Sequence, residues 1–253
     1  MLDFAPVPFD EIAAETRRHL ASLPAAIESF LEKHILASTH YRMLIAGEPA
    51  GFASIHDGRL ITQFALSAPW RRHGQALFAQ VRRLEQVQAA FVPTCDEFFL
   101  AHALDDFRVL RKQAYFFATS PQPAQPPPGF ALRAAEPADA ALIRRESGDF
   151  LDRVEEQIAA GEIFVVWRGD ETVGLGALER SVLYENVASI GMFTRERYRR
   201  QGVGTATIAL LIARCRDHGL RPVAGCWYYN HASKRTLERA GLYAGTRLLR
   251  IAY

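Results

Sequence analysis

Apolar and polar positions follow the same order twice along the chain. In the first half, YRMLIA and AGFASI flank the turn GEP and predict a β-hairpin over residues 41–55. In the second half, IFVVW and VGLGAL flank RGDE and predict another over residues 163–178. A third apolar run follows each hairpin, LITQFAL at 60–66 and ASIGMFT at 188–194, and leads into an arginine pair and a glycine. The pattern indicates two related halves in tandem.

After each glycine the apolar period changes from two to 3.6. Apolar residues recur at i, i+3, i+4 and i+7 from Ile208, and at i, i+4 and i+7 from Leu77. Both segments are therefore predicted to be helices that pack one face on a sheet, and Gly219 is placed to end the second helix.

Each half is expected to end in the same way, with a strand, a helix and a last strand. In the second half these are a strand from Pro222, a helix from Asn230 to Gly241 and an alternating strand to the C-terminus. The first half repeats the order loosely, as FFLA from Phe98, a helix over 105–113 and AYFF over 114–117.

A proline cluster separates the halves. The stretch TSPQPAQPPPG over residues 119–129 favours an extended tether because proline lacks a backbone donor and breaks helices. We therefore predict a domain over 1–118, a linker over 119–129 and a domain over 130–253, with residues 1–40 adding helices to the first. Matching glycines lie 123 and 128 residues apart, so a duplication with five inserted residues in the second copy explains the pattern.

Composition narrows the class of protein. The 253 residues are 49% hydrophobic and 23% charged, which is typical of globular domains with full cores. The net charge of the chain is +2. The part before residue 120 carries −1 and the part after it +3, a distribution too even to indicate a nucleic-acid-binding face. Three cysteines in no zinc or disulfide spacing indicate a reducing compartment and no metal site. The first twenty residues lack a continuous apolar segment, so we expect no membrane association and a cytoplasmic protein.

The arginine–glycine segment of the second half is a candidate functional site. Arg199, Gly202 and Gly204 in RRQGVG form Arg-x-x-Gly-x-Gly between a predicted strand and a predicted helix. Two glycines let backbone N–H groups approach a pyrophosphate, and the helix N-terminus and the arginines add positive charge. A lone Gly-x-Gly is usually a turn, but the strand before it and the helix after it favour a phosphate site here.

In these residues the second half resembles the GNAT superfamily of acyl-CoA-dependent N-acyltransferases. The resemblance rests on the strand GMFT over 191–194, the loop over 199–204, and the Asn-His-Ala-Ser helix from Asn230 that ends in Ala-Gly-Leu. It implies an α+β fold of two tandem GNAT-like domains, each a mixed, mostly antiparallel sheet flanked by helices.

In the first half, Arg71, Gly74 and Ala76 still fit the loop pattern. The asparagine position, however, holds Ala103, and the closing glycine is Ala114. The first copy therefore looks like a degenerate member of the same fold, and we expect it to pack against the second and close its acceptor side.

The resemblance also implies acetyl-CoA as co-substrate. The backbone of Met192 and Thr194 would bind the pantetheine amides and polarise the acetyl carbonyl, and Asn230 would bind the pantetheine arm, although it could equally be a plain helix N-cap. The implied cofactor-binding residues are Met192, Phe193, Thr194, Arg199, Arg200, Gln201, Gly202, Val203, Gly204, Thr205, Asn230 and Ser233.

Two catalytic groups remain to be assigned. Many family members carry an acidic tyrosine where this chain has Leu237, which cannot donate a proton. Tyr229 or Tyr243 could replace it, or the thiol could leave as a thiolate. For the base, Glu185 lies at the entry to the GMFT strand, where its neighbour Asn186 fits equally well; His231 is a second candidate. We take Glu185 and Tyr229 as the catalytic hypothesis.

The expected activity is N-acetyl transfer from acetyl-CoA to a primary amine of a small molecule or peptide. An alternative is a catalytically weak acyl-CoA-binding sensor or partner module, which Leu237 and the uncertain base favour. The sequence specifies neither the acceptor nor the oligomeric state, and it gives no sign of a nucleic-acid or membrane partner.

Overall fold

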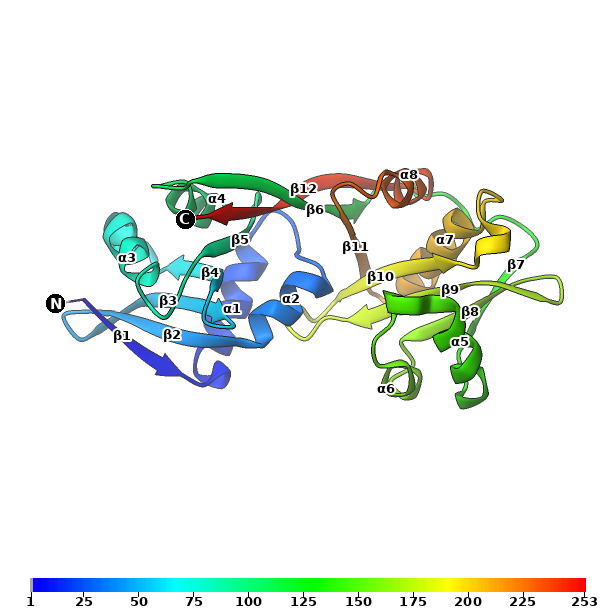
Figure 1. Cartoon of the computed structure of the whole chain (residues 1–253), viewed down its shortest axis with the longest axis horizontal. Coiled ribbons are helices and arrows are strands. Elements are labelled where there is room, and N and C mark those ends of the chain that lie inside the picture. Colours follow the sequence, from blue (N-terminus) through cyan, green and yellow to red (C-terminus); the bar gives the residue numbers. More distant parts are fainter. Residues whose placement is uncertain (1) are drawn as a thin grey trace. The chain divides into compact units, whose positions relative to one another are not determined.

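A computed structural model describes residues 2–253, which form two compact units (Figure 1). The first unit contains the chain up to Phe116 together with Trp227–Tyr229 and Gly245–Tyr253. The second contains Phe117–Cys226 and Asn230–Ala244. The units thus divide near the predicted linker, but the last nine residues, expected in the second domain, lie in the first unit.

The first unit is built on a mixed sheet. Strands β1 to β4 are antiparallel in sequence order, β5 runs parallel to β4, and the C-terminal part of β12 pairs antiparallel with β5. Its elements are β1 (Leu2–Val7), α1 (Phe9–Ser22), α2 (Ser29–Leu36), β2 (Ser38–Ile45), β3 (Glu48–His56), β4 (Leu60–Leu66), η1 (Ala68–His73), α3 (Gly74–Val81), β5 (Ala89–Pro93), α4 (Glu97–Ala103) and β6 (Val109–Thr119), of which β6 ends in the second unit.

Alternation along β4 divides the core of the first unit into two faces. Phe64 packs with Leu77 and Phe78 of α3 on one face, whereas its neighbour Ala65 packs with Ile12 of α1 on the other. Successive side chains of a strand point to opposite faces, so the sheet is covered on both sides.

The second unit repeats this plan. Strands β7 to β10 are antiparallel and β11 is parallel to β10. Its elements are β7 (Phe130–Ala134), η2 (Pro137–Asp139), α5 (Ala140–Ser147), η3 (Gly148–Phe150), α6 (Val154–Ala159), β8 (Ile163–Arg168), β9 (Glu171–Arg180), β10 (Val187–Thr194), η4 (Glu196–Tyr198), α7 (Val203–Asp217), β11 (Arg221–Trp227), α8 (His231–Arg239) and the start of β12 (Leu242–Ala252).

Both units contain a pair of parallel strands that separate early. In the second unit, β10 and β11 pair only over Val187–Ser189, so they diverge before Met192. In the first, β4 and β5 pair only at Leu60 and Ile61. The backbone beyond each pairing is left without a strand partner on that side.

The predicted hairpins, third strands and helices α3 and α7 are confirmed, as is the α+β fold of two related domains. Two predictions in the first half are wrong. The segment from Phe98 lies in helix α4, not in a strand, and the helix expected over 105–113 is replaced by a turn and the start of β6. The sequence signal that we overlooked is Asp96, whose side chain caps α4 by accepting from the N–H of Phe99.

No helix within residues 2–253 is long and apolar enough to cross a membrane.

Candidate functional site

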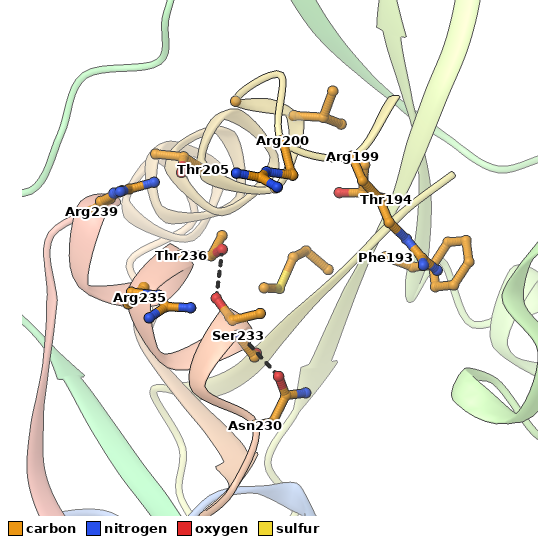
Figure 2. A pocket seen from close by; sticks show the side chains of 15 residues that line it. Phe193, Thr194, Arg199, Arg200, Thr205, Asn230, Ser233, Arg235, Thr236 and Arg239 are labelled. Carbon is orange, nitrogen blue, oxygen red and sulfur yellow. Dashed lines mark hydrogen bonds between the residues drawn. The ribbon is translucent and has the colours of Figure 1, made fainter. Parts of the chain in front are cut away.

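A groove of about 1040 Å³ lies in the second unit between the end of β10, the loop before α7, and α8 (Figure 2). It contains eleven of the twelve cofactor-binding residues predicted from the sequence. The exception is Gln201, whose side chain turns to Arg168 and to the carbonyl of Arg197. The lining residues are Met192, Phe193, Thr194, Arg199, Arg200, Gly202, Val203, Gly204, Thr205, Asn230, Ala232, Ser233, Arg235, Thr236 and Arg239.

The loop before α7 has the backbone of an anion-binding turn. Arg200 has φ +64° and Gly202 has φ +81°, both in the left-handed region, and α7 begins directly afterwards at Val203. Turns of this kind gather backbone N–H groups in front of a helix N-terminus, where the helix dipole adds partial positive charge. The loop is therefore suited to a phosphate or pyrophosphate.

Gly204 lies where three elements converge. A Cβ on this residue would lie 3.0 Å from Cγ2 of Thr236 on α8 and 3.4 Å from Oγ1 of Thr194 on β10. Because the first of these distances is already tighter than ordinary contacts, a larger side chain would have to extend into the groove or displace its walls.

Four arginines give the groove its charge. Arg199 and Arg200 come from the loop, and Arg235 and Arg239 lie one helical turn apart on α8. No carboxylate lines the groove within the described chain. The α8 pair is not among the residues predicted from the sequence, although its i, i+4 spacing after Asn230 was the available signal. This charge fits a ligand with more than one phosphate group.

The end of β10 presents two different faces. Met192 and Thr194 lie beside Gly204, on the side of α7 and α8. The ring of Phe193 instead lies 6.0 Å from that of Phe150, and Phe150 would also contact a Cβ placed on Gly191. The strand therefore separates the groove from a second face that is covered by η3.

One carboxylate on this second face was not considered in the sequence analysis. Glu179 of β9 pairs directly with Ser189, and residues directly opposite in an antiparallel pair share a face. Ser189, Gly191 and Phe193 alternate along β10, so Glu179 belongs to their side of the sheet. Its side chain is partly exposed.

Asn230 acts as the N-cap of α8. Its Oδ1 accepts a hydrogen bond of 3.0 Å from the N–H of Ser233, and its amide also lines the groove (Figure 2). The helix-cap role left open by the sequence is therefore present in the structure.

The structure does not bring the catalytic candidates to the groove. Glu185 is exposed in the loop before β10, whereas the groove lies at the other end of that strand. The five residue steps from Val187 to Met192 alone span about 17 Å at the usual strand rise. Tyr229 belongs to the first unit and packs on Trp227 with ring centroids 5.1 Å apart.

The other acid and base candidates lie outside the groove as well. Tyr243, His231 and Asn186 are exposed and do not line it, and Leu237 is buried on α8 with 2% of its surface accessible. The position where many relatives carry an acidic tyrosine is thus part of the core.

The first copy lacks the left-handed loop that forms one wall of the groove in the second. Its segment with Arg71 runs from η1 straight into α3 without a left-handed residue, and His73 precedes the helix with φ −96°. A Cβ on Gly74 would overlap the imidazole of His102, so that ring covers the start of α3. The counterpart of Asn230 is the N-cap Asp96, which corrects the assignment of Ala103 to that position.

A groove between a splayed strand, a glycine loop and a helix N-terminus, as found here in an α+β domain, is suited to a phosphorylated ligand. The model of the acetyltransferase (GNAT) domain matches residues 9–120, and that of the acetyltransferase (GNAT) family matches residues 131–242. The chain therefore belongs to the GNAT acetyltransferases, as two GNAT domains in tandem. Acetyl-CoA is the acyl donor of such domains.

Solved structures share the fold at low sequence identity. A GNAT-family acetyltransferase from Colwellia psychrerythraea has a TM-score of 0.89 and 14% identity, with coverage of 100% of this chain and 99% of that one. A tandem GNAT protein from the clavulanic acid biosynthesis pathway has a TM-score of 0.62 and 12% identity, covering 100% and 98%. A GCN5-related N-acetyltransferase from Sphaerobacter thermophilus has a TM-score of 0.64 and 15% identity, covering 99% and 95%. Comparison with curated proteins found no match.

Proposed function

We propose that this protein transfers the acetyl group of acetyl-CoA to a primary amine of a small molecule or peptide, and that the second copy performs the reaction. The observation that supports it is the contrast between the copies. The left-handed loop, the four arginines and the open groove occur together in the second, whereas His102 covers the start of the helix in the first.

The residues of the groove fit acetyl-CoA, which supplies an activated thioester. The N–H groups of the loop and of the first turn of α7 would hold its pyrophosphate, with Arg199 and Arg200 beside them. On the side of β11 the backbone after Ser189 has no strand partner, and there Met192 and Thr194 would bind the pantetheine arm and polarise the acetyl carbonyl.

The acceptor amine must lose its proton to a base, and the described residues that line the groove offer none. We propose Glu179 for this role in place of Glu185, because it lies opposite Ser189, three residues from Met192, or about 10 Å along the strand. A carboxylate at that distance would act through water. Because Leu237 is buried, the thiol would leave as a thiolate, which its ordinary pKa of ~8.5 permits.

The acyl-CoA-binding sensor remains the second candidate function. It is favoured by the buried Leu237 and by the absence of any acid or base residue among the described residues that line the groove. A CoA-release assay against a panel of amines separates the two candidates. Release that depends on the amine supports the enzyme, and tight CoA binding without release supports the sensor.

The choice of base leads to a paired prediction. Glu179→Gln is expected to lower kcat/KM roughly 10²-fold, the usual scale of general base assistance, and to leave acetyl-CoA affinity unchanged. Glu185→Gln, an equal charge change on an exposed loop, is expected to alter kcat/KM less than about threefold. Steady-state kinetics and calorimetric titration measure both quantities. The reverse ranking would return the role to Glu185.

The α8 arginines lead to a second prediction. Arg235→Ala and Arg239→Ala are each expected to weaken CoA binding about tenfold, because each removes charge-assisted hydrogen bonds to a phosphate. Arg216→Ala is the matched control, since Arg216 is exposed near the far end of α7. Calorimetric titration with CoA and dephospho-CoA tests this, and a selective loss with CoA assigns the arginines to the 3′-phosphate. Equal affinities for the α8 variants and the control would contradict the prediction.

A further inference from the structure

The first unit contains a pocket of about 480 Å³ that the proposed reaction does not use. It lies between α1, the first residues of β3, the end of β4 and the start of η1. Phe52, Ala65 and Leu66 form an apolar floor, each at most 6% exposed. The volume suits a small metabolite and is less than half that of the groove in the second unit.

Positive charge dominates the rim of this pocket. Arg18 of α1 and Arg71 of η1 line it. The guanidinium of Arg71 lies 5.5 Å from the ring centre of Phe98, and neither arginine has a carboxylate partner within residues 2–253. The carboxylate in the lining belongs to Glu15 and is already bound. Nη1 of Arg42 donates to its Oε1 at 3.0 Å and to its Oε2 at 3.2 Å. The charge of both arginines is therefore not neutralised by a carboxylate, and a guanidinium pairs best with a carboxylate or phosphate group.

A histidine held by Asp96 also lines the pocket. Nε2 of His19 is 2.8 Å from Oδ2 of Asp96, a side chain with 6% of its surface exposed. The other oxygen of Asp96 caps α4 through the N–H of Phe99, so the carboxylate is held from two sides. Nδ1 of His19 has no hydrogen-bond partner in the part of the chain that the structure describes.

Comparison of the two copies explains why the pocket is open. The N–H of Ser67 bonds to the carbonyl of Ala50 just as that of Arg195 bonds to Val173 in the second unit, so Ser67 and Arg195 are equivalent. The Arg195 guanidinium lies 3.0 Å from Glu146 of α5, and this ion pair holds the pKa of the Glu146 carboxyl below its ordinary value. In the first unit a small hydroxyl residue replaces that arginine.

At a neighbouring position the first unit again carries a smaller side chain than the second. Ala65 pairs with Phe52, as Phe193 pairs with Leu175 in the second unit. The first copy therefore carries alanine where the second carries a phenyl ring. The two exchanges, to serine and to alanine, both remove side-chain volume from this side of the first sheet.

We propose that the first unit binds a small anion in this pocket, a compound with a carboxylate or phosphate group on a short apolar body. Arg18 and Arg71 bind the anionic group, His19 supplies a further hydrogen bond, and the apolar part rests on Phe52 and Ala65. The site is separate from the CoA groove, and the left-handed loop on which that groove depends is absent from this unit.

Calorimetric titration of the full chain tests the proposal, with succinate and inorganic phosphate as probes and methylammonium as the cationic control. Each titration is repeated with saturating CoA, so that binding in the groove of the second unit is recognised by competition. Succinate or phosphate is expected to bind saturably in the presence of CoA, and methylammonium is not. The stronger of the two anions identifies the head group.

Variants locate the binding. Arg18→Ala and Arg71→Ala are each expected to weaken it about tenfold or more, the usual effect of losing a charged hydrogen bond. Arg17→Ala and Arg72→Ala remove the same charge from adjacent residues outside the lining and are expected to change affinity less than twofold. Absence of saturable anion binding, or equal losses in all four variants, would overturn the proposal. CoA binding is measured separately and does not affect this outcome.

Discussion

Gly204→Val is expected to abolish acetyl-CoA binding, with a loss of affinity of 100-fold or more. Even a single Cβ at this position would lie 3.0 Å from Thr236, and the two methyl groups of valine would extend into the space beside Thr194 and Met192. Overpacking of this kind typically costs 1–3 kcal/mol, and here it would also block the start of α7. Calorimetric titration with acetyl-CoA measures the effect.

Ala76→Val is the matched control for this prediction. Ala76 fits the same motif in the first copy, but it is exposed on α3, in a unit without the left-handed loop. The Ala76→Val variant should bind acetyl-CoA with the same affinity as the unaltered protein. Unchanged affinity in a folded Gly204→Val variant would refute the assignment of the groove to CoA.

Deletion of Gly245–Tyr253 is expected to unfold the first unit. Leu248 and Ile251 are fully buried and pair with β5, and the hydroxyl of Tyr253 donates to the carbonyl of Ala103. Burial of each aliphatic side chain contributes about 1.5–3 kcal/mol, against a total stability of about 5–15 kcal/mol for a domain. Chemical denaturation followed by tryptophan fluorescence and circular dichroism measures the loss.

Two single substitutions in the same strand test whether burial of its side chains causes this loss of stability. Ile251→Ala should destabilise the first unit by about 2–5 kcal/mol, the usual cost of such a truncation in a core. Arg250→Ala, at a neighbouring and partly exposed position, should have little effect. A deletion variant with the denaturation midpoint of the full chain would show that the strand is dispensable. The same strand gives a reason to expect that an isolated fragment over 126–253 would be poorly soluble, since residues 245–253 would lose β5 as their partner.

Local chemistry explains why much of the groove could be predicted from sequence. The loop before α7 depends on glycines at positions with special backbone conformations, and Gly202 does adopt the left-handed region. The 3.6-residue period of α7 and the N-cap Asn230 are also local signals. Each could be recognised without knowing what lies across the sheet.

Other features depend on partners distant in sequence. Strand β5 is five buried residues without alternation, and its partner β12 lies more than 150 residues further on, so no local pattern reveals the pair. Glu179 gains its position only through its register with Ser189. The open pocket of the first unit likewise results from what Ser67 and Ala65 lack relative to the other copy.

The placement of Gly245–Tyr253 also affects how the protein is synthesised. Domains generally fold as units during translation, the N-terminal one first. Here the first unit cannot complete its sheet until the ribosome has made the whole second unit and the last strand has emerged. Until then β5 has an unpaired edge, and the nascent chain carries an incomplete first unit. We therefore expect its yield in cells to depend on chaperones that protect exposed strand edges more than that of a tandem protein whose domains are each continuous in sequence.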